Sequence, residues 1–144
     1  MTLGYDRNPS ANAAAFVDGY LRTGDRGMLD ADGYLSLIGR IKELINRGGE
    51  KISPPEIDAV LLAHPAVAEA ASFGVPDDKY GEEISAAVIL KTPASEQELR
   101  AYCRERLADF KVPKTVHFVT ELPKTATGKV QRSALTRTFA GKPT

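Results

Sequence analysis

Short apolar runs separated by polar turns dominate the second half of this chain. Three of these runs consist largely of β-branched and small apolar residues, at 67–75, 84–90 and 116–119. Runs of this length, bounded by proline, glycine and charged residues, are typical of buried strands. We therefore expect a three-stranded sheet whose first two strands are joined by the loop from Pro76 to Gly81.

Apolar residues spaced three and four positions apart predict a helix over 54–63. Ser53 is suited to the N-cap, Pro54 to the first helical position, and Glu56 completes the pattern of a capping box. The apolar face of this helix consists of Ile57, Val60 and Leu61.

A second capping box, Ser95 with Glu98, predicts a helix over 95–107. Cys103 lies on its apolar face, so we interpret this cysteine as part of the core. A further helix is expected around 133–139, and His117 is expected to face solvent from the third strand because of its place in the alternation.

Two glycine turns predict hairpins nearer the start of the chain. Asp32-Gly33 lies between apolar pairs, and Gly48-Gly49 follows Leu44-Ile45. We expect an α+β fold: a small two-stranded hairpin around 34–52, then the three-stranded sheet backed by the two helices.

The overall charge is balanced, with 19 basic and 19 acidic residues, so the composition does not indicate a nucleic-acid partner. The single cysteine excludes an internal disulfide and favours a reducing compartment. No apolar run is long enough for a membrane span. We expect a cytoplasmic protein; a peroxisomal one in a eukaryote stays open, although the sequence ends without Ser-Lys-Leu.

Chemistry is concentrated in two basic, glycine-containing stretches. The first, 39–55, surrounds Gly48-Gly49 with four cations, and the second, 122–132, presents Lys129 after Gly128. Both suit an anion, although the second lacks the full spacing of a phosphate loop. The simpler alternatives are an exposed hairpin with solvated lysines and, for Asp25, an ordinary turn carboxylate rather than an acceptor for a diol. No residue pattern indicates a metal site: the aspartates at 30 and 32 lack the calcium-loop spacing.

Taken together and in this order, the motifs closely resemble the C-terminal domain of the AMP-forming acyl-CoA synthetases, in the adenylate-forming superfamily. The wording around Gly48-Gly49 is most similar to the oxalate–CoA ligase and 4-coumarate–CoA ligase-like branch. The segments that carry the resemblance are Tyr20–Asp25, Gly39–Ile45, Gly48–Pro54, Pro76–Glu82 and Pro123–Lys129.

The resemblance implies an enzyme that joins a carboxylic acid to CoA in two half-reactions. The acid and ATP form an acyl-adenylate and pyrophosphate, and the CoA thiol then displaces AMP. Asp25, with Arg40 beside it, would hold the ribose hydroxyls of ATP or AMP, and Lys129 would be the catalytic lysine that bridges the carboxylate and the α-phosphate. Mg²⁺ would be bound mainly by the large N-terminal domain of such enzymes.

The resemblance also assigns the second half-reaction. Gly48, Gly49 and Glu50 match the loop that lines the pantetheine tunnel for CoA, and Lys42 matches the hinge about which the domain turns. Because Lys129 and the glycine turn would serve different half-reactions, a rotation about Lys42 would exchange them. Asn46 stands where some relatives have a phosphate-contacting lysine, and its role stays open.

The resemblance implies that this chain is a fragment of a longer enzyme. Residues 1–38 would be the tail of the large N-terminal domain plus linker, and residues 39–144 the mobile C-terminal lid domain. The expected partners are the N-terminal domain, ATP, CoA, a carboxylic acid and a lysine acyltransferase acting on Lys129. Two alternatives stay open: the lid of a domain that loads a carrier protein, and a non-catalytic binding or regulatory module.

Overall fold

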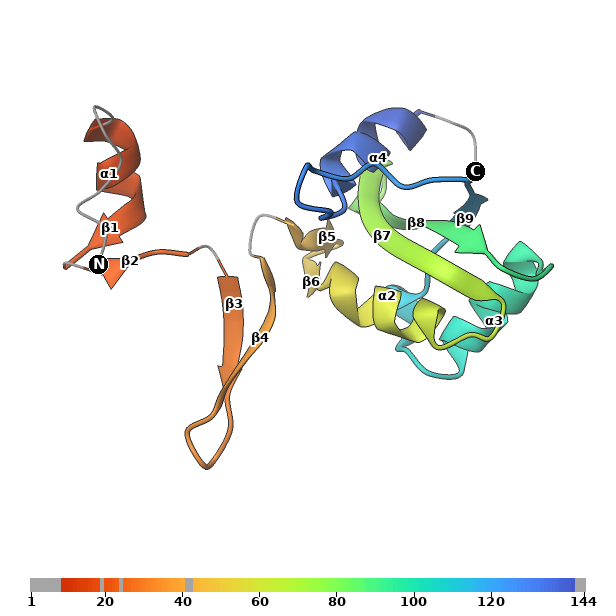
Figure 1. Cartoon of the computed structure of the whole chain (residues 1–144), viewed down its shortest axis with the longest axis horizontal. Coiled ribbons are helices and arrows are strands. Elements are labelled where there is room, and N and C mark those ends of the chain that lie inside the picture. The colour runs from red at the N-terminus through yellow and green to blue at the C-terminus, as the bar shows by residue number, and fades with distance from the viewer. Residues whose placement is uncertain (1–8, 19, 24, 41–42, 142–144) are drawn as a thin grey trace. The chain divides into compact units, whose positions relative to one another are not determined.

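The computed structural model describes residues 9–18, 20–23, 25–40 and 43–141. The chain divides into two compact units, Met1–Lys42 and Glu43–Thr144, and Figure 1 labels the elements of both. Lys42, the expected hinge, lies outside the described residues.

The first unit consists of a short helix and two hairpins. Helix α1 (Pro9–Ala15) precedes strands β1 (Phe16–Val17) and β2 (Tyr20–Leu21), which pair with each other. Strands β3 (Asp25–Leu29) and β4 (Leu35–Arg40) form an antiparallel hairpin. The expected turn at Asp32-Gly33 is confirmed: the Asp30 carboxylate accepts the backbone N–H groups of Asp32 and Tyr34, both at 2.9 Å, and Gly33 has φ +84°.

The second unit is built on a mixed sheet of five strands. The sheet order is β6-β5-β8-β7, and β9 runs parallel to β8. The α+β class is therefore confirmed, and the expected strands and helices exist with small shifts of their ends. The elements are β5 (Ile45–Arg47), β6 (Glu50–Ile52), α2 (Pro54–Leu62), β7 (Val67–Asp77), β8 (Gly81–Leu90), α3 (Glu96–Arg104), the 3-10 turn η2 (Asp109–Lys111), β9 (Thr115–Phe118) and α4 (Arg132–Phe139).

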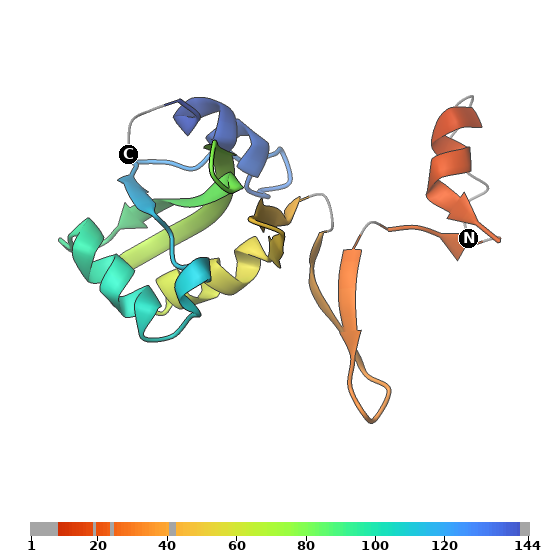
Figure 2. The same ribbon diagram turned by 180° about the vertical axis from the view of Figure 1, so that it is seen from behind.

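The helices cover both faces of this sheet, as Figures 1 and 2 show: α2 and α3 lie on one face and α4 on the other. Alternate residues of the strands point to the two faces. Ile84 and Val88 of β8 therefore pack in the cluster that includes Ile57 and Leu99, whereas Phe73 packs with residues of α4.

The hairpin expected around 34–52 is wrong. The residues 35–40 pair with β3 across the Asp-Gly turn, because that partner is only a few residues away in the chain. The residues 45–52 form a separate hairpin across Gly48-Gly49, and Arg47 then pairs with Gly81 of β8. The expected three-stranded sheet thus gains β5 and β6.

One of the two expected capping boxes is also wrong. Ser53 does occupy the N-cap of α2, but its side chain makes no capping hydrogen bond. Pro54 and Pro55 have no N–H to offer, and the Glu56 carboxylate is bonded to Lys111 Nζ at 3.0 Å. The second box, Ser95 with Glu98, is confirmed in both directions.

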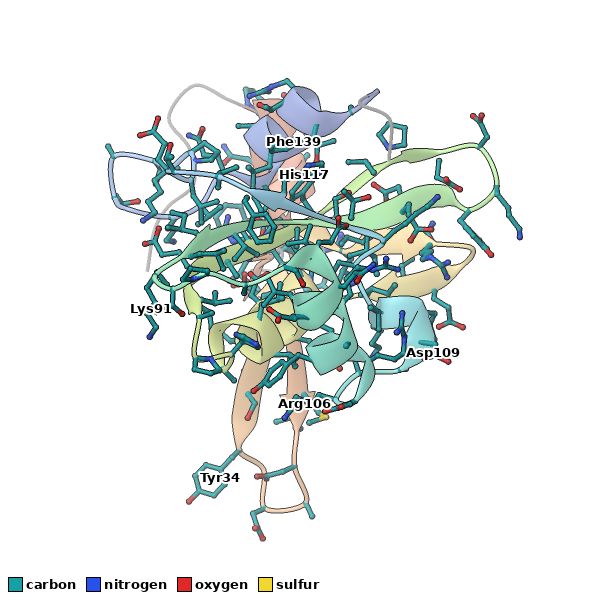
Figure 3. All side chains as sticks on the ribbon, turned by 90° about the vertical axis from the view of Figure 1, so that its right-hand side faces the viewer. Tyr34, Lys91, Arg106, Asp109, His117 and Phe139 are labelled. Carbon is teal, nitrogen blue, oxygen red and sulfur yellow. The ribbon has the colours of Figure 1, made fainter. Side chains whose placement is uncertain are left out.

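His117 does not simply face solvent. Its ring stacks on Phe139 of α4, with centroids 4.0 Å apart and planes 16° apart, and the two labels lie together in Figure 3. Because α4 covers this face of the sheet, the partly buried His117 packs against Phe139, which borders a second core cluster. Cys103, by contrast, is buried as expected.

Candidate functional site

The candidate ribose acceptor, Asp25, lies opposite Arg40 in the β3–β4 hairpin. Arg40 Nε is 3.7 Å from Asp25 Oδ1, and the Asp25 side chain is 28% exposed. The backbone N–H of Asp25 donates to Thr23 Oγ1 at 3.3 Å. The Asp25 carboxylate thus keeps lone pairs that can accept hydrogen bonds from hydroxyl groups, and the Arg40 guanidinium lies beside it.

The Gly48-Gly49 turn is a tight two-residue connection between β5 and β6. Both residues have positive φ, +58° and +90°, which other residues adopt only with strain. The Gly48 N–H donates to the Tyr80 carbonyl oxygen at 2.8 Å. A Cβ placed at Gly49 would meet no atom within 4 Å, so its backbone is open to a ligand, and the neighbouring Glu50 is exposed.

An ion pair that the sequence analysis missed supports this turn. Arg47 Nε donates to Glu83 Oε1 at 2.7 Å, and the Arg47 guanidinium lies 4.0 Å above the Tyr80 ring. The hydrogen bond that Arg47 donates to Glu83 raises the pKa of the Arg47 guanidinium above its ordinary value. Glu83 is buried, so the pair fixes the turn against the sheet. The signal available in the sequence was a charged residue directly before the apolar run 84–90.

The loop before α4 holds its shape through its own hydrogen bonds. Thr125 N–H donates to the Lys129 carbonyl oxygen at 2.8 Å, and Lys129 N–H donates to Thr125 Oγ1 at 3.2 Å. Gly128 has φ +85°. The Lys129 side chain is exposed, and its ammonium makes no hydrogen bond or ion pair to the residues that the structure describes. The loop backbone is therefore fixed by its own hydrogen bonds, and the ammonium that it carries is exposed.

The two candidate surfaces of the second unit are attached to different parts of β7. The Lys129 loop is bonded to the first half of the strand, through Glu69 and Ser72. The glycine turn is bonded to Tyr80, beyond the end of the strand. In Figure 3 the loop before α4 and the β5–β6 hairpin lie toward opposite sides of the unit. Asp25 and Arg40 belong to the first unit.

No group of three or more His, Cys, Asp or Glu side chains among the described residues could hold a metal ion. None of the helices in the described part of the chain has the length and apolar character needed to cross a bilayer.

The chain is similar in sequence to known CoA ligases. The chain is 57% identical to an oxalate–CoA ligase of Arabidopsis thaliana over 99% of its length and 54% identical to one of Saccharomyces cerevisiae over 97%. It spans only 28% and 26% of those two proteins. The expected likeness to oxalate–CoA ligases is thus confirmed.

Solved structures agree with the fold. ATP-bound MatB from Rhodopseudomonas palustris matches with a TM-score of 0.90 and 37% identity, over 96% of this chain and 28% of that one. The o-succinylbenzoate CoA synthetase of Bacillus subtilis, in complex with an acyl-adenylate intermediate, matches with a TM-score of 0.87 and 45% identity, over 90% and 27%. The family model for the AMP-binding enzyme C-terminal domain matches residues 56–129, about half of the sequence. The chain belongs to the family of AMP-binding enzyme C-terminal domains.

Proposed function

We propose that this chain is the C-terminal lid of an ATP-dependent, AMP-forming carboxylic acid–CoA ligase. Residues 1–38 would be the tail of the large domain with its linker, and residues 39–144 the lid. The curated relatives named CoA ligases, of which the chain spans about a quarter, support this assignment over a carrier-protein-loading domain.

The observation that carries the proposal is the exposed ammonium of Lys129 on a loop fixed by its own hydrogen bonds. An ammonium without a described partner, on a loop fixed by its own hydrogen bonds, suits a charge that a second domain brings into use. In the closed enzyme it would neutralise the carboxylate and the α-phosphate as the acyl-adenylate forms. A donor of this kind, preorganised in a site that excludes water, contributes on the order of 10²–10³ in rate.

The glycine turn would serve the second half-reaction. Gly49 offers bare backbone with open space around it, which allows the thin pantetheine arm of CoA to pass close to the chain. Glu50 stands at the exposed edge of the same turn. The CoA thiol would lose its proton to solvent and attack the acyl carbonyl carbon of the acyl-adenylate, and AMP would leave with the electrons of the broken C–O bond.

Asp25 and Arg40 would hold the ribose of ATP or AMP, and Lys42 would be the hinge. A carboxylate is suited to two neighbouring hydroxyl groups because each of its oxygens can accept a hydrogen bond, and Arg40 lies 3.7 Å from it. Mg²⁺ would be bound with the ATP phosphates mainly by the large domain.

Exposed apolar side chains in the first unit support a large-domain partner. Each is at least 60% exposed, and patches of this kind mark surfaces that are covered in a complete protein. The residues are Tyr20, Met28, Leu29, Tyr34, Leu35 and Leu37. The exposure of Lys129 also suits a lysine acyltransferase, whose product would lack the charge.

The decisive experiment is Lys129→Ala in the full-length enzyme that contains this chain. We expect pyrophosphate exchange with ATP to fall by 10² or more, while thioester formation from supplied acyl-adenylate is retained. Lys91→Ala, an exposed lysine in the turn after β8, is the matched control and should change neither half-reaction. Equal loss of both half-reactions in Lys129→Ala would contradict the proposal. The chain on its own should give no pyrophosphate exchange with any carboxylic acid.

A further inference from the structure

The Lys129 loop ends at an arginine with three acidic or carbonyl partners. Arg132, the first residue of α4, lies three residues after Lys129. Its Nη2 is 2.7 Å from Asp58 Oδ2, and its Nη1 donates to the Ser72 carbonyl oxygen at 2.7 Å. One guanidinium therefore joins the end of the loop to both α2 and β7.

Asp58 is itself held rigidly. Its Oδ1 accepts the backbone N–H of Ser72 at 2.6 Å and the Ser72 hydroxyl at 2.8 Å. Asp58 is 8% exposed as a residue, and the Arg132 side chain is 16% exposed. An ion pair at this depth, with further hydrogen bonds on both partners, is a strong geometric constraint, because breaking it leaves a charge without compensation.

At the other end of the loop, Leu122 is buried in the same cluster as Leu135, but the ion pair is weak. Lys124 Nζ is 2.8 Å from Glu69 Oε1, but both side chains are about 40% exposed. Exposed pairs of this kind contribute little, because water screens them and two long side chains lose freedom. Of the ion pairs at the two ends of the loop, the one at Arg132 is therefore the stronger constraint.

Arg132 also reaches the segment that follows the proposed hinge. Its Nε is 3.6 Å from Glu43 Oε2, and Glu43 is the residue directly after Lys42. The same side chain therefore contacts both the start of the second unit and the end of the Lys129 loop.

The geometry points to Arg132 as a positioning residue for adenylation: its pairing with Asp58 and Ser72 sets the place of the loop backbone that carries Lys129. This inference rests on the proposed function, in which Lys129 acts on the forming acyl-adenylate. Arg132 touches no substrate in this account. Because a reacting group displaced by about 1 Å can cost on the order of 10²-fold in rate, releasing this anchor should be seen first in adenylation.

The test measures both half-reactions in the full-length enzyme with Arg132→Lys and Asp58→Asn. Lysine keeps the charge but cannot bond Asp58 and Ser72 as a fork, and asparagine keeps an acceptor for Ser72 but loses the ion pair. We expect each variant to slow adenylation about tenfold or more, with thioester formation from supplied acyl-adenylate within about threefold of the parent. Because the two residues act as one unit, the double variant should be no slower than the worse single variant.

Glu69→Gln is the matched control, since it breaks the exposed pair at the other end of the loop. It should leave adenylation within about twofold. Normal adenylation in both Arg132→Lys and Asp58→Asn, an equal fall of both half-reactions, or equal damage from Glu69→Gln would each overturn the inference. If Lys129→Ala itself leaves adenylation unchanged, the proposed function fails instead, which keeps the two failures apart.

Discussion

The backbone N–H of Gly48 donates to the carbonyl oxygen of Tyr80 at 2.8 Å, which joins the β5–β6 turn to the turn that precedes β8. The two residues are 32 positions apart in the chain. The Tyr80 ring also lies against Gly48, since a Cβ built there would be 3.1 Å from Tyr80 Cδ1. The candidate CoA surface is therefore made by two separate motifs in contact.

Replacing Gly49 of this turn should impair thioester formation as well as stability. Gly49→Ala is expected to lower the free energy of unfolding by about 1–2 kcal/mol, because alanine resists positive φ. Its methyl group would also enter the proposed pantetheine path, so thioester formation should fall while adenylation is retained. Half-reaction assays combined with urea titrations measure the two effects.

Gly33→Ala is the matched control for that experiment. Gly33 has φ +84° and open space around it, but it lies in the β3–β4 hairpin. It should show similar destabilisation with no selective loss of thioester formation. A selective loss in this variant, or none in Gly49→Ala, would argue against the pantetheine role.

The turn that carries Tyr80 should depend on the ionisation of Asp77. The Asp77 carboxylate accepts the backbone N–H of Tyr80 at 2.8 Å and that of Lys79 at 3.0 Å, and these bonds hold its pKa below the ordinary value. The folded state thus stabilises the charged form, and this contribution is present at neutral pH and lost as the pH falls through the folded pKa.

Asp77→Asn is therefore expected to be less stable than the parent chain above about pH 4, where the unfolded carboxyl group is ionised. The difference between the two chains should shrink to nothing at still lower pH. Urea titrations between pH 7 and pH 2.5 would measure it; a difference that is constant with pH would contradict the role of the charge.

The hinge proposal predicts a split between half-reactions for Lys42→Pro in the full-length enzyme. Proline fixes φ near −65°, so a rotation that needs another backbone conformation becomes costly. Adenylation should be retained and thioester formation slowed. Lys42→Ala, which leaves φ free, is the control; if it slows the second step as much as proline does, the lysine side chain rather than the backbone is responsible.

Cys103 should be chemically protected while the chain is folded. Burial raises the pKa of its thiol to about 11, with the Arg106 charge acting weakly in the opposite direction. At pH 8 almost none of the reactive thiolate is present. A thiol-modifying dye should react slowly in buffer and rapidly in concentrated denaturant, and fast labelling of the folded chain would show that the site opens.

Several elements could be predicted from residues that are neighbours in the sequence. The Asp-Gly turn, the Gly-Gly turn and the Ser95 capping box depend on residues within four positions of each other, and all three form. The strand and helix segments of the second unit were also predicted, because their apolar residues follow the periods of the two structures.

Contacts between residues far apart in the sequence explain the predictions that were wrong or missing. The Ser53 capping box fails because Lys111, 55 residues from Glu56, takes its carboxylate. The ring of His117 is stacked on Phe139 because α4 packs over β9. Arg47 of β5 pairs with Glu83 of the neighbouring strand β8.

The sequence by itself determined which residues carry chemistry and the conformations set by neighbours along the chain, since these depend on side chains a few positions apart. Only the tertiary structure decided which of them are fixed. Arg132 is 74 residues from Asp58, and their pairing exists because α2 and α4, on opposite faces of the sheet, both pack against β7. A hydrophobic pattern specifies that faces are buried, but the partner of a buried charge is specified only by how those faces pack.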